Sequence, residues 1–283
     1  MKAVFLVLAV LGISLQAITK KQYNAKSCGK GVFTFGAVSV LFAWLFFLFL
    51  SRLKLTFAPE ILPYALIFAI SYGTATVTGF IALRLGALSL TSLITATSLV
   101  IPTLFGIFFY SERISVTFAV GFFLVLLSIV LMNSKKSEVK ISLGWAVSVF
   151  FAFLGNGVCS AAQNAAQREL LGRYKYEFMI ISLSVVFLIL LISALFTERG
   201  EIASHLRCGA HYMALCGIAN GAVNLVVMLL ATRMPASVMF PVMSAGGIIL
   251  SSLVSRFVYR ERLSPKQLAA LFFGITAVVL MNI

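Results

Sequence analysis

Long apolar stretches follow one another along almost the whole chain and restrict it to a bundle of membrane-spanning helices. A helix needs about 20 mostly apolar residues to cross the hydrocarbon core of a bilayer. Ten stretches qualify: 3–18, 32–51, 61–83, 88–110, 116–132, 143–163, 178–196, 209–231, 235–258 and 265–282. Each is continuously apolar, whereas the strands of a membrane barrel alternate apolar and polar residues over about 10 positions. We therefore expect an all-α polytopic membrane protein with ten transmembrane helices.

The charged residues support a membrane protein rather than a soluble one. They make up 11% of the chain, compared with roughly 25% in an average soluble domain. The net charge of +14 comes from 22 Lys and Arg that lie between or at the ends of the apolar stretches. Cations in such places anchor helices at lipid head groups. The chain has no basic segment of domain size, as a nucleic-acid-binding protein would need. We therefore expect the lipid bilayer, and not nucleic acid, as a partner.

Two short patterns could suggest processing or metal binding. The stretch 3–18 follows a Lys and resembles a signal peptide, but a matching segment opens the second half, so we expect it to remain as a span. The four cysteines and two histidines have none of the common zinc-ligand spacings. We therefore predict no metal site and no cofactor.

A repeated hexapeptide reveals an internal duplication. The chain contains YSERIS at 110–115 and YRERLS at 259–264, 149 positions apart. At this offset, residues 84–133 match residues 233–282 at fourteen of 50 positions, including charged and polar ones. We predict two five-helix repeats, 1–134 and 142–283, joined by a linker at 135–141. Because five is an odd number, the second repeat enters the membrane from the opposite side, and the repeats are inverted, as in many secondary transporters.

The hexapeptides themselves predict a turn between two helices. Ser264 precedes a Pro at the start of a helix, and Ser115 occupies the same position in the first repeat, so both are expected helix caps. The Glu-Arg pair has two interpretations, a charged turn at the membrane interface or a gate that opens as the halves move. The residues concerned are Glu112, Arg113, Glu261 and Arg262.

These patterns resemble the drug/metabolite transporter superfamily, and within it the EamA-type transporters. The resemblance is carried by Glu-Arg-hydrophobic-Ser before the last span of each half and by the segment LGWAVSVFFAFLGNGVCSAAQNAAQRE at 143–169. It implies a carrier of small metabolites, often an exporter of amino acids or related compounds. Members often have a Pro about a dozen residues before each Glu. Here Pro102 and Pro241 lie 10 and 20 residues before their Glu, and we predict that they are hinges.

Polar residues inside the spans predict where a substrate binds. Such residues are costly in lipid and usually face protein or a water-filled cavity. They concentrate in the third, fourth, sixth, eighth and ninth spans, so we predict that the second, fifth, seventh and tenth are peripheral and face lipid or a second copy in a homodimer. The predicted cavity residues are Ser71, Tyr72, Thr95, Ser98, Asn156, Ser160, Gln163, Asn220, Asn224 and Ser244.

Helix packing is the alternative explanation for many of these residues. Ser and Thr commonly join helices in membranes, and Gly217 and Gly221 form a GxxxG pattern that allows two backbones to approach closely. The amides are harder to explain by packing alone, because Asn156, Gln163 and the Asn220–Asn224 pair supply more hydrogen-bonding capacity than packing needs.

The acidic residues constrain the mechanism. All eight are Glu, and each lies at or beyond the end of an apolar stretch. No carboxylate is therefore expected inside a span to carry protons or to bind an organic cation. We expect a secondary transporter or permease that moves a small neutral or zwitterionic solute, such as an amino acid, outward by alternating access. A lipid or lipid-precursor flippase is the alternative. An enzyme is not expected, because no His, Asp or Glu lies inside a span except His211, which is near the end of one.

The apolar spans and the family resemblance predict in which membrane the protein lies, but they do not predict its orientation there. We expect a multi-pass protein in the cytoplasmic membrane of a bacterium. The connections after odd-numbered spans hold 14 Lys and Arg and the other face holds 8, which would place the termini outside. The family resemblance implies termini inside, so the orientation is left open.

Overall fold

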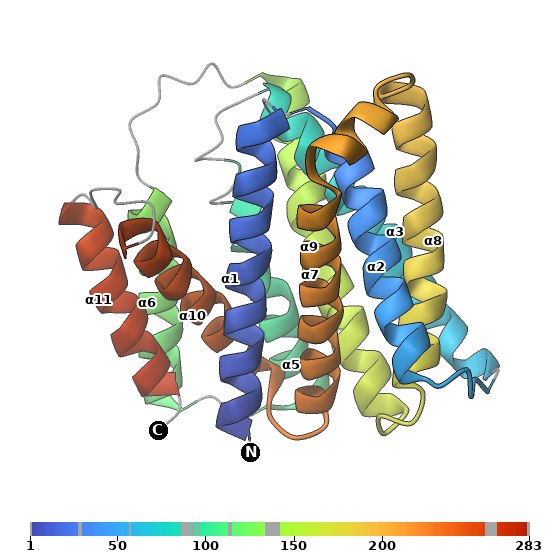
Figure 1. Ribbon diagram of the computed structural model, residues 1–283. Coiled ribbons are helices and arrows are strands. Elements are labelled where there is room, and N and C mark those ends of the chain that lie inside the picture. The colour runs from blue at the N-terminus through green and yellow to red at the C-terminus, as the bar shows by residue number, and fades with distance from the viewer. Residues whose placement is uncertain are drawn as a thin grey trace.

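The computed structural model describes residues 2–27, 30–56, 58–85, 91, 94–95, 97–112, 115–133, 142–257 and 265–281. Within these residues the chain is helical and has no strand, and each of the ten predicted ranges contains a helix (Figure 1). The long helices are α1 (Lys2–Ser27), α2 (Val32–Leu50), α3 (Leu62–Leu85), α5 (Val100–Tyr110), α6 (Val116–Asn133), α7 (Leu143–Glu169), α8 (Lys175–Thr197), α9 (Ile202–Ala231), α10 (Ala236–Phe257) and α11 (Pro265–Met281).

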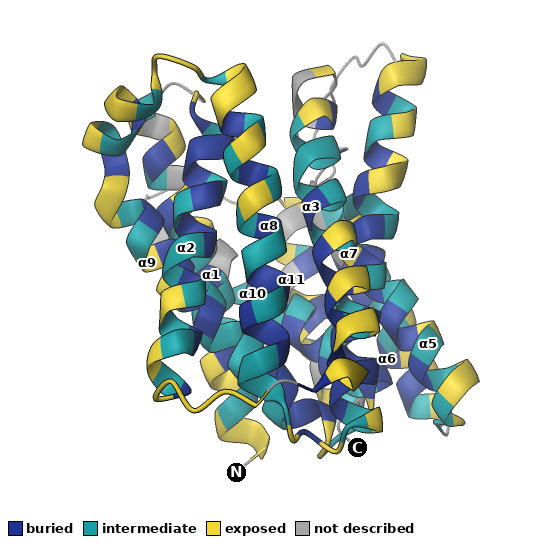
Figure 2. Ribbon diagram, turned by 90° about the vertical axis from the view of Figure 1, so that its right-hand side faces the viewer, coloured by how far each residue is buried: buried dark blue, intermediate teal, exposed yellow. Residues whose placement is uncertain are grey.

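Length and composition identify a multi-pass membrane protein. Among the described residues, six helices are long and apolar enough to cross a membrane: α1, α2, α3, α7, α8 and α9. Shorter apolar helices occupy Thr97–Tyr110, Val116–Ser128, Ala236–Gly247 and Leu268–Ala277. Exposed residues lie along the outer faces of the helices (Figure 2). Large apolar residues are among the exposed ones, such as Phe108 and Phe196, which are 76% and 84% exposed. Such a surface suits lipid rather than water.

Several helices extend beyond the apolar stretches that predicted them. Helix α1 continues to Ser27, nine residues past the predicted end at 18, and α9 begins at Ile202 instead of 209. Hydropathy measures only the segment buried in lipid, whereas Lys, Gln and Ala are good helix formers in water as well. The added turns of α1 carry Lys20 and Tyr23 toward the functional site described below.

The helices pack in pairs drawn from the two predicted repeats. Helix α3 packs along α7, α1 along α9, and α2 lies between α8 and α9, while α6 packs against α11 (Figure 1). The prediction that the second and seventh spans are peripheral is wrong, because α2 and α8 each have eight buried residues and each contacts two helices of the other half. An almost wholly apolar sequence is equally suited to lipid and to protein neighbours, so its composition could not distinguish them.

Small residues set the closest contacts between helices. A Cβ atom added to Gly221 would lie 2.7 Å from the Phe46 ring, and one added to Gly217 would lie 2.7 Å from the Phe42 Cβ. These two glycines therefore allow α9 to approach α2, and the prediction from the GxxxG pattern is confirmed. Gly155 plays the same part between α7 and α3, where an added Cβ would lie 3.0 Å from Ala75.

Hydrogen bonds from neighbouring residues fix where helices begin. The Ser115 hydroxyl accepts a bond of 3.0 Å from the amide of Phe118, so the predicted cap of α6 is confirmed. Ser142 caps α7 in the same way, by accepting a bond of 3.1 Å from the amide of Trp145. The corresponding Ser264 lies outside the described residues.

Candidate functional site

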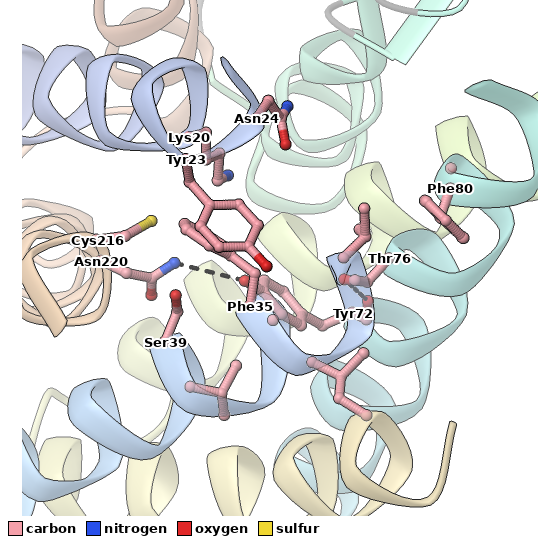
Figure 3. A pocket seen from close by; sticks show the side chains of 15 residues that line it. Lys20, Tyr23, Asn24, Phe35, Ser39, Tyr72, Thr76, Phe80, Cys216 and Asn220 are labelled. Carbon is pink, nitrogen blue, oxygen red and sulfur yellow. Dashed lines mark hydrogen bonds between the residues drawn. The ribbon is translucent and has the colours of Figure 1, made fainter. Parts of the chain in front are cut away.

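A cavity of about 490 Å³ lies among α1, α2, α3, α8 and α9 (Figure 3). It extends from Asn220 and Tyr72, in the middle of α9 and α3, to Lys20 and Asn24, which are exposed near the C-terminal end of α1. Its volume falls within the range of sites that bind small molecules. The cavity therefore connects the interior of the bundle to one end of it.

Amides and hydroxyls form the deep end of this cavity. The Asn220 side-chain amide donates to the Tyr72 hydroxyl, at 3.4 Å, and to the Gln16 side-chain carbonyl, at 3.3 Å (Figure 3). Ser39, a residue that is 8% exposed, also lines the cavity, and its hydroxyl has no hydrogen-bond partner among the described residues. These groups can donate to or accept from a polar solute.

A chain of amides continues from the deep end toward the opposite end of the bundle. Asn224 donates its amide to the side-chain carbonyl of Asn220, at 2.6 Å, one turn away on α9. Gln163 of α7, which is 4% exposed, donates in turn to the side-chain carbonyl of Asn224, at 3.0 Å. The chain links α7 to α9 and satisfies polar groups that would otherwise be buried without a partner.

Aromatic side chains and small residues make up much of the rest of the lining. Tyr23, Phe35 and Phe80 present rings. Gly36 and Gly79 also belong to the lining. Lys20 is the one charged residue among the described residues that line the cavity. The site therefore offers apolar walls, neutral polar groups at one end and a cation at the other.

Glu198 holds the start of α2, where Val32 lines the cavity. Its carboxylate accepts bonds from the amides of Phe33 and Thr34, at 2.9 and 2.8 Å, and from the Thr34 hydroxyl, at 2.6 Å. A negative charge at a helix N-terminus satisfies free amides and interacts favourably with the helix dipole. Gly31 precedes α2 with φ of 72°, and an added Cβ would lie 2.5 Å from the His205 ring, so a glycine is required there.

Glu112 fastens the two halves together at the other end of the bundle. Beyond the end of α5, its carboxylate accepts bonds of 2.9 Å from the amides of Ala236 and Ser237 at the start of α10, and it pairs with Arg168 at the end of α7. Burial acts to raise the pKa of Glu112, but the hydrogen bonds from Ser237 and Ala236 and the charge of Arg168 outweigh it and hold the pKa below its ordinary value of 4.5. Glu112 therefore caps a helix of the opposite half as an anion.

Not all of the predicted cavity residues meet at the cavity. Tyr72 and Asn220 line it, and Gln163 and Asn224 belong to the amide chain beside it. Asn156 instead donates to the Ser98 hydroxyl, at 2.8 Å, between α7 and the short helix Thr97–Leu99. The structure places four others away from the cavity lining: Ser71 on α3, Thr95, which donates to the Thr91 carbonyl, Ser160, which donates to the Asn156 carbonyl, and Ser244 on α10. Pro241, which was predicted as a hinge, lies inside α10 and also away from the lining.

The remaining predictions fall on α5 or outside the described residues. Pro102 is buried near the start of α5. The gate or turn residues Arg113, Glu261 and Arg262 lie outside the residues that the structure describes.

Sequence reasoning missed the cavity residues that α1 and α2 supply. Lys20, Tyr23 and Asn24 lie past the apolar stretch and resembled a connection, and Ser39 sits in a span that seemed peripheral. The usable signal was the helical spacing of Gln16, Lys20 and Tyr23, which places them on one face of a helix that continues from 3–18.

Comparisons with known proteins establish the fold alone. No protein-family model matches the chain, and no curated protein matches it. A solved structure titled "Crystal structure of protein" is similar, with a TM-score of 0.78 and 14% sequence identity. The match covers 99% of this chain and 95% of the other. The chain therefore has an architecture already seen in an experimental structure, whose title states no activity.

Proposed function

We propose that the chain is a secondary transporter that moves a small polar metabolite across a bacterial cytoplasmic membrane by alternating access. The observation that carries this proposal is the cavity of about 490 Å³ inside an apolar bundle, lined by groups from α1, α2 and α3 of one half and α8 and α9 of the other. A cavity shared between two halves and open at one end is what alternating access requires.

The closed end supports the same mechanism. Between the cavity and the end that holds the Glu112 contacts lies the Gln163–Asn224–Asn220 chain, all in hydrogen-bond contact. The amide chain joins α7 to α9 within the second half. The Glu112 contacts join α5 of the first half to α7 and α10 of the second, and the Asn220 bonds to Gln16 and Tyr72 join α9 to the first half. Breaking them while the mouth near Lys20 closes would expose the deep end of the cavity to the opposite side.

Two arrangements support inverted repeats of the kind that the EamA-type resemblance implies. The equivalent helices α1 and α7 run in opposite directions, as do α2 and α8 (Figure 1). The neighbours are exchanged in the same manner, since α3 packs on α7 while its equivalent α9 packs on α1. Such reciprocity is expected when a duplicated unit is related to its copy by an axis in the membrane plane.

The cavity favours a soluble solute over a lipid. A flippase needs a polar groove that is open sideways to lipid, so that the acyl chains can stay in the membrane while the head group crosses. Here five helices surround the cavity, and the exposed lining residues Lys20 and Asn24 lie near the end of α1. We therefore rank a carrier of small metabolites above a lipid flippase.

Solute flux into proteoliposomes tests the proposal. A panel of radiolabelled amino acids, organic acids and sugars is offered to vesicles that contain the wild type, Asn220→Leu or Asn156→Leu. We expect at least one solute to enter faster than into empty vesicles, with the flux lost in Asn220→Leu because the deep end loses its amide. Asn156→Leu is the matched control, because Asn156 bonds to Ser98 away from the cavity lining. If no solute enters faster than into empty vesicles, the proposal is wrong.

A further inference from the structure

Lys20 gives the cavity a positive charge that no described carboxylate neutralises. Among the described residues, no acid lines the cavity, and none forms an ion pair with Lys20. Glu198, whose charge acts on Tyr23, does not line the cavity, and its carboxylate is directed to the amides and hydroxyl at the start of α2. Lys20 is exposed at the open end of the cavity, where a cation attracts anions and repels cations that enter.

The deep end provides a second group suited to an anion. The Ser39 hydroxyl is buried and has no partner among the described residues, and Figure 3 shows it near Asn220. A free hydroxyl can donate to a carboxylate or phosphate oxygen, and hydrogen bonds to a charged acceptor are stronger than those to a neutral one. Between Ser39 and Lys20 stand the rings of Tyr23 and Phe35, which suit an apolar or aromatic body.

We infer that the cavity selects an organic anion, with Lys20 as the residue that determines the charge of the solute. This inference rests on the proposed function and narrows it, because a zwitterion would bring an ammonium group for which the described lining has no carboxylate. An anionic head group pairs with the Lys20 ammonium, and the body of the solute contacts the rings of Tyr23, Phe35 and Phe80.

The sign of the potential in the cavity can be measured without knowing the solute. In a cysteine-free background, Ser39→Cys is labelled with the anionic sulfonatoethyl and the cationic trimethylammonioethyl methanethiosulfonates. We expect the ratio of anionic to cationic labelling rates, corrected for their rates with a free thiol, to fall about threefold to tenfold on Lys20→Gln. Lys20→Arg should keep the ratio. Lys2→Gln is the matched control, because it removes the same charge from the other end of α1.

Matched probes of different charge test the selectivity itself. The melting temperature of the purified protein is measured with 3-phenylpropionate, its neutral amide, and 3-phenylpropylamine, which share one aromatic body. We expect the acid to raise the melting temperature, the amide and the amine to do so less, and the advantage of the acid to vanish in Lys20→Gln but persist in Lys20→Arg. Lys20 is exposed, so its substitution should leave the melting temperature of the protein without added solute unchanged.

The outcomes separate this inference from the proposed function. A labelling ratio that Lys20→Gln leaves unchanged, or stabilisation by the amide or the amine that equals that by the acid, overturns the inference. If none of the three probes stabilises the protein, the inference is judged by whether Lys20→Gln lowers the labelling ratio. Flux of neutral solutes that is indifferent to Lys20→Gln would leave transport standing without anion selection. A Lys20-dependent ratio without flux of any solute would leave anion binding standing and contradict transport.

Discussion

At the scale of single residues, the amide chain shows why some polar groups belong to the site and others to packing. Ser and Thr inside the spans mostly return their hydroxyls to their own helix, as Thr78 does to the Thr74 carbonyl, at 2.7 Å. A hydroxyl is satisfied by the carbonyl one turn earlier, whereas a side-chain amide has two donors and an acceptor, which is more than one turn of its own helix can satisfy. Asn224 donates to Asn220 one turn earlier on α9, and the chain then reaches other helices through Gln163 of α7 and Tyr72 of α3.

Asn224→Ala tests the value of this chain. The substitution leaves the buried Gln163 amide without its 3.0 Å partner, which should lower the free energy of unfolding by about 1–3 kcal/mol. The measurement is reversible unfolding in mild detergent or bicelles. Thr276→Ala is the control, because Thr276 is on α11 and bonds only to the Phe272 carbonyl of its own helix. If Asn224→Ala is as stable as Thr276→Ala, then the bond between Gln163 and Asn224 does not stabilise the protein.

Gly217→Ala tests the contact between α9 and α2. An added methyl group would lie 2.7 Å from the Phe42 Cβ and push α2 away from the cavity wall, at a cost of about 1–3 kcal/mol from overpacking. The readout is the melting temperature in detergent. In contrast, Gly79→Ala places its Cβ 3.7 Å from Ala152, an ordinary contact, and should not destabilise the protein because Ala has the higher helix propensity. If Gly217→Ala is as stable as Gly79→Ala, then α9 and α2 can move apart without cost, and the close contact at Gly217 does not stabilise the protein.

At the scale of helices, both ends of the bundle depend on a carboxylate that caps a helix of the other half. Glu112 follows α5 and caps α10, and Glu198 follows α8 and caps α2. Each contact joins segments more than 120 residues apart, so its strength sets how firmly the two halves hold together at that end. We predicted from the sequence that both acids lie outside the spans. Their hydrogen-bond partners could not be predicted, because those partners are far away along the chain.

Glu112→Gln should weaken the cap of α10 in a manner that depends on pH. Because the folded pKa of Glu112 lies below its ordinary value of 4.5, its stabilisation is fully present above that value and is lost as the pH falls through the folded pKa. We expect Glu112→Gln to be about 1–2 kcal/mol less stable than the wild type near neutral pH. The difference should narrow below about pH 4.5.

Melting temperatures of the two proteins between pH 3 and 7 provide the measurement. Glu60→Gln is a suitable control, because Glu60 is an exposed acid at the start of α3 that accepts none of the hydrogen bonds found here. A constant difference between Glu112→Gln and the wild type over the whole range would rule out the anionic cap.

At the scale of the whole molecule, the proposed mechanism predicts that access to the cavity is one-sided and adjustable. In oriented vesicles, an impermeant thiol reagent should label Ser39→Cys faster from the face at the C-terminal end of α1, where the cavity opens. Glu112→Gln weakens the opposite closure and should shift labelling several-fold toward the other face, because a loss of about 1–2 kcal/mol changes a two-state equilibrium by about 5-fold to 30-fold at most. Labelling from both faces at rates that Glu112→Gln does not alter would contradict alternating access.

The sequence by itself determined that the chain is helical, where the helices lie to within a few turns, and that it enters a membrane. Every segment that crosses hydrocarbon must by itself avoid the cost of burying polar groups there. Each such segment is therefore visible in the sequence as a long apolar stretch. The sequence also predicted the cap at Ser115, which depends on neighbours along the chain, and the close approach at Gly217 and Gly221, which their spacing on one face of a helix permits whichever helix packs there.

Only the tertiary structure decided which polar residues share a site. Asn156 and Gln163 lie on one face of α7, yet one bonds to Ser98 and the other to Asn224, because different helices cross that face at different heights. Lys20 reaches the cavity because α1 continues past its apolar stretch, and Ser39 does because α2 is drawn between α8 and α9. A cavity is the space left by the packing of several helices, so its lining depends on crossings that no single segment encodes.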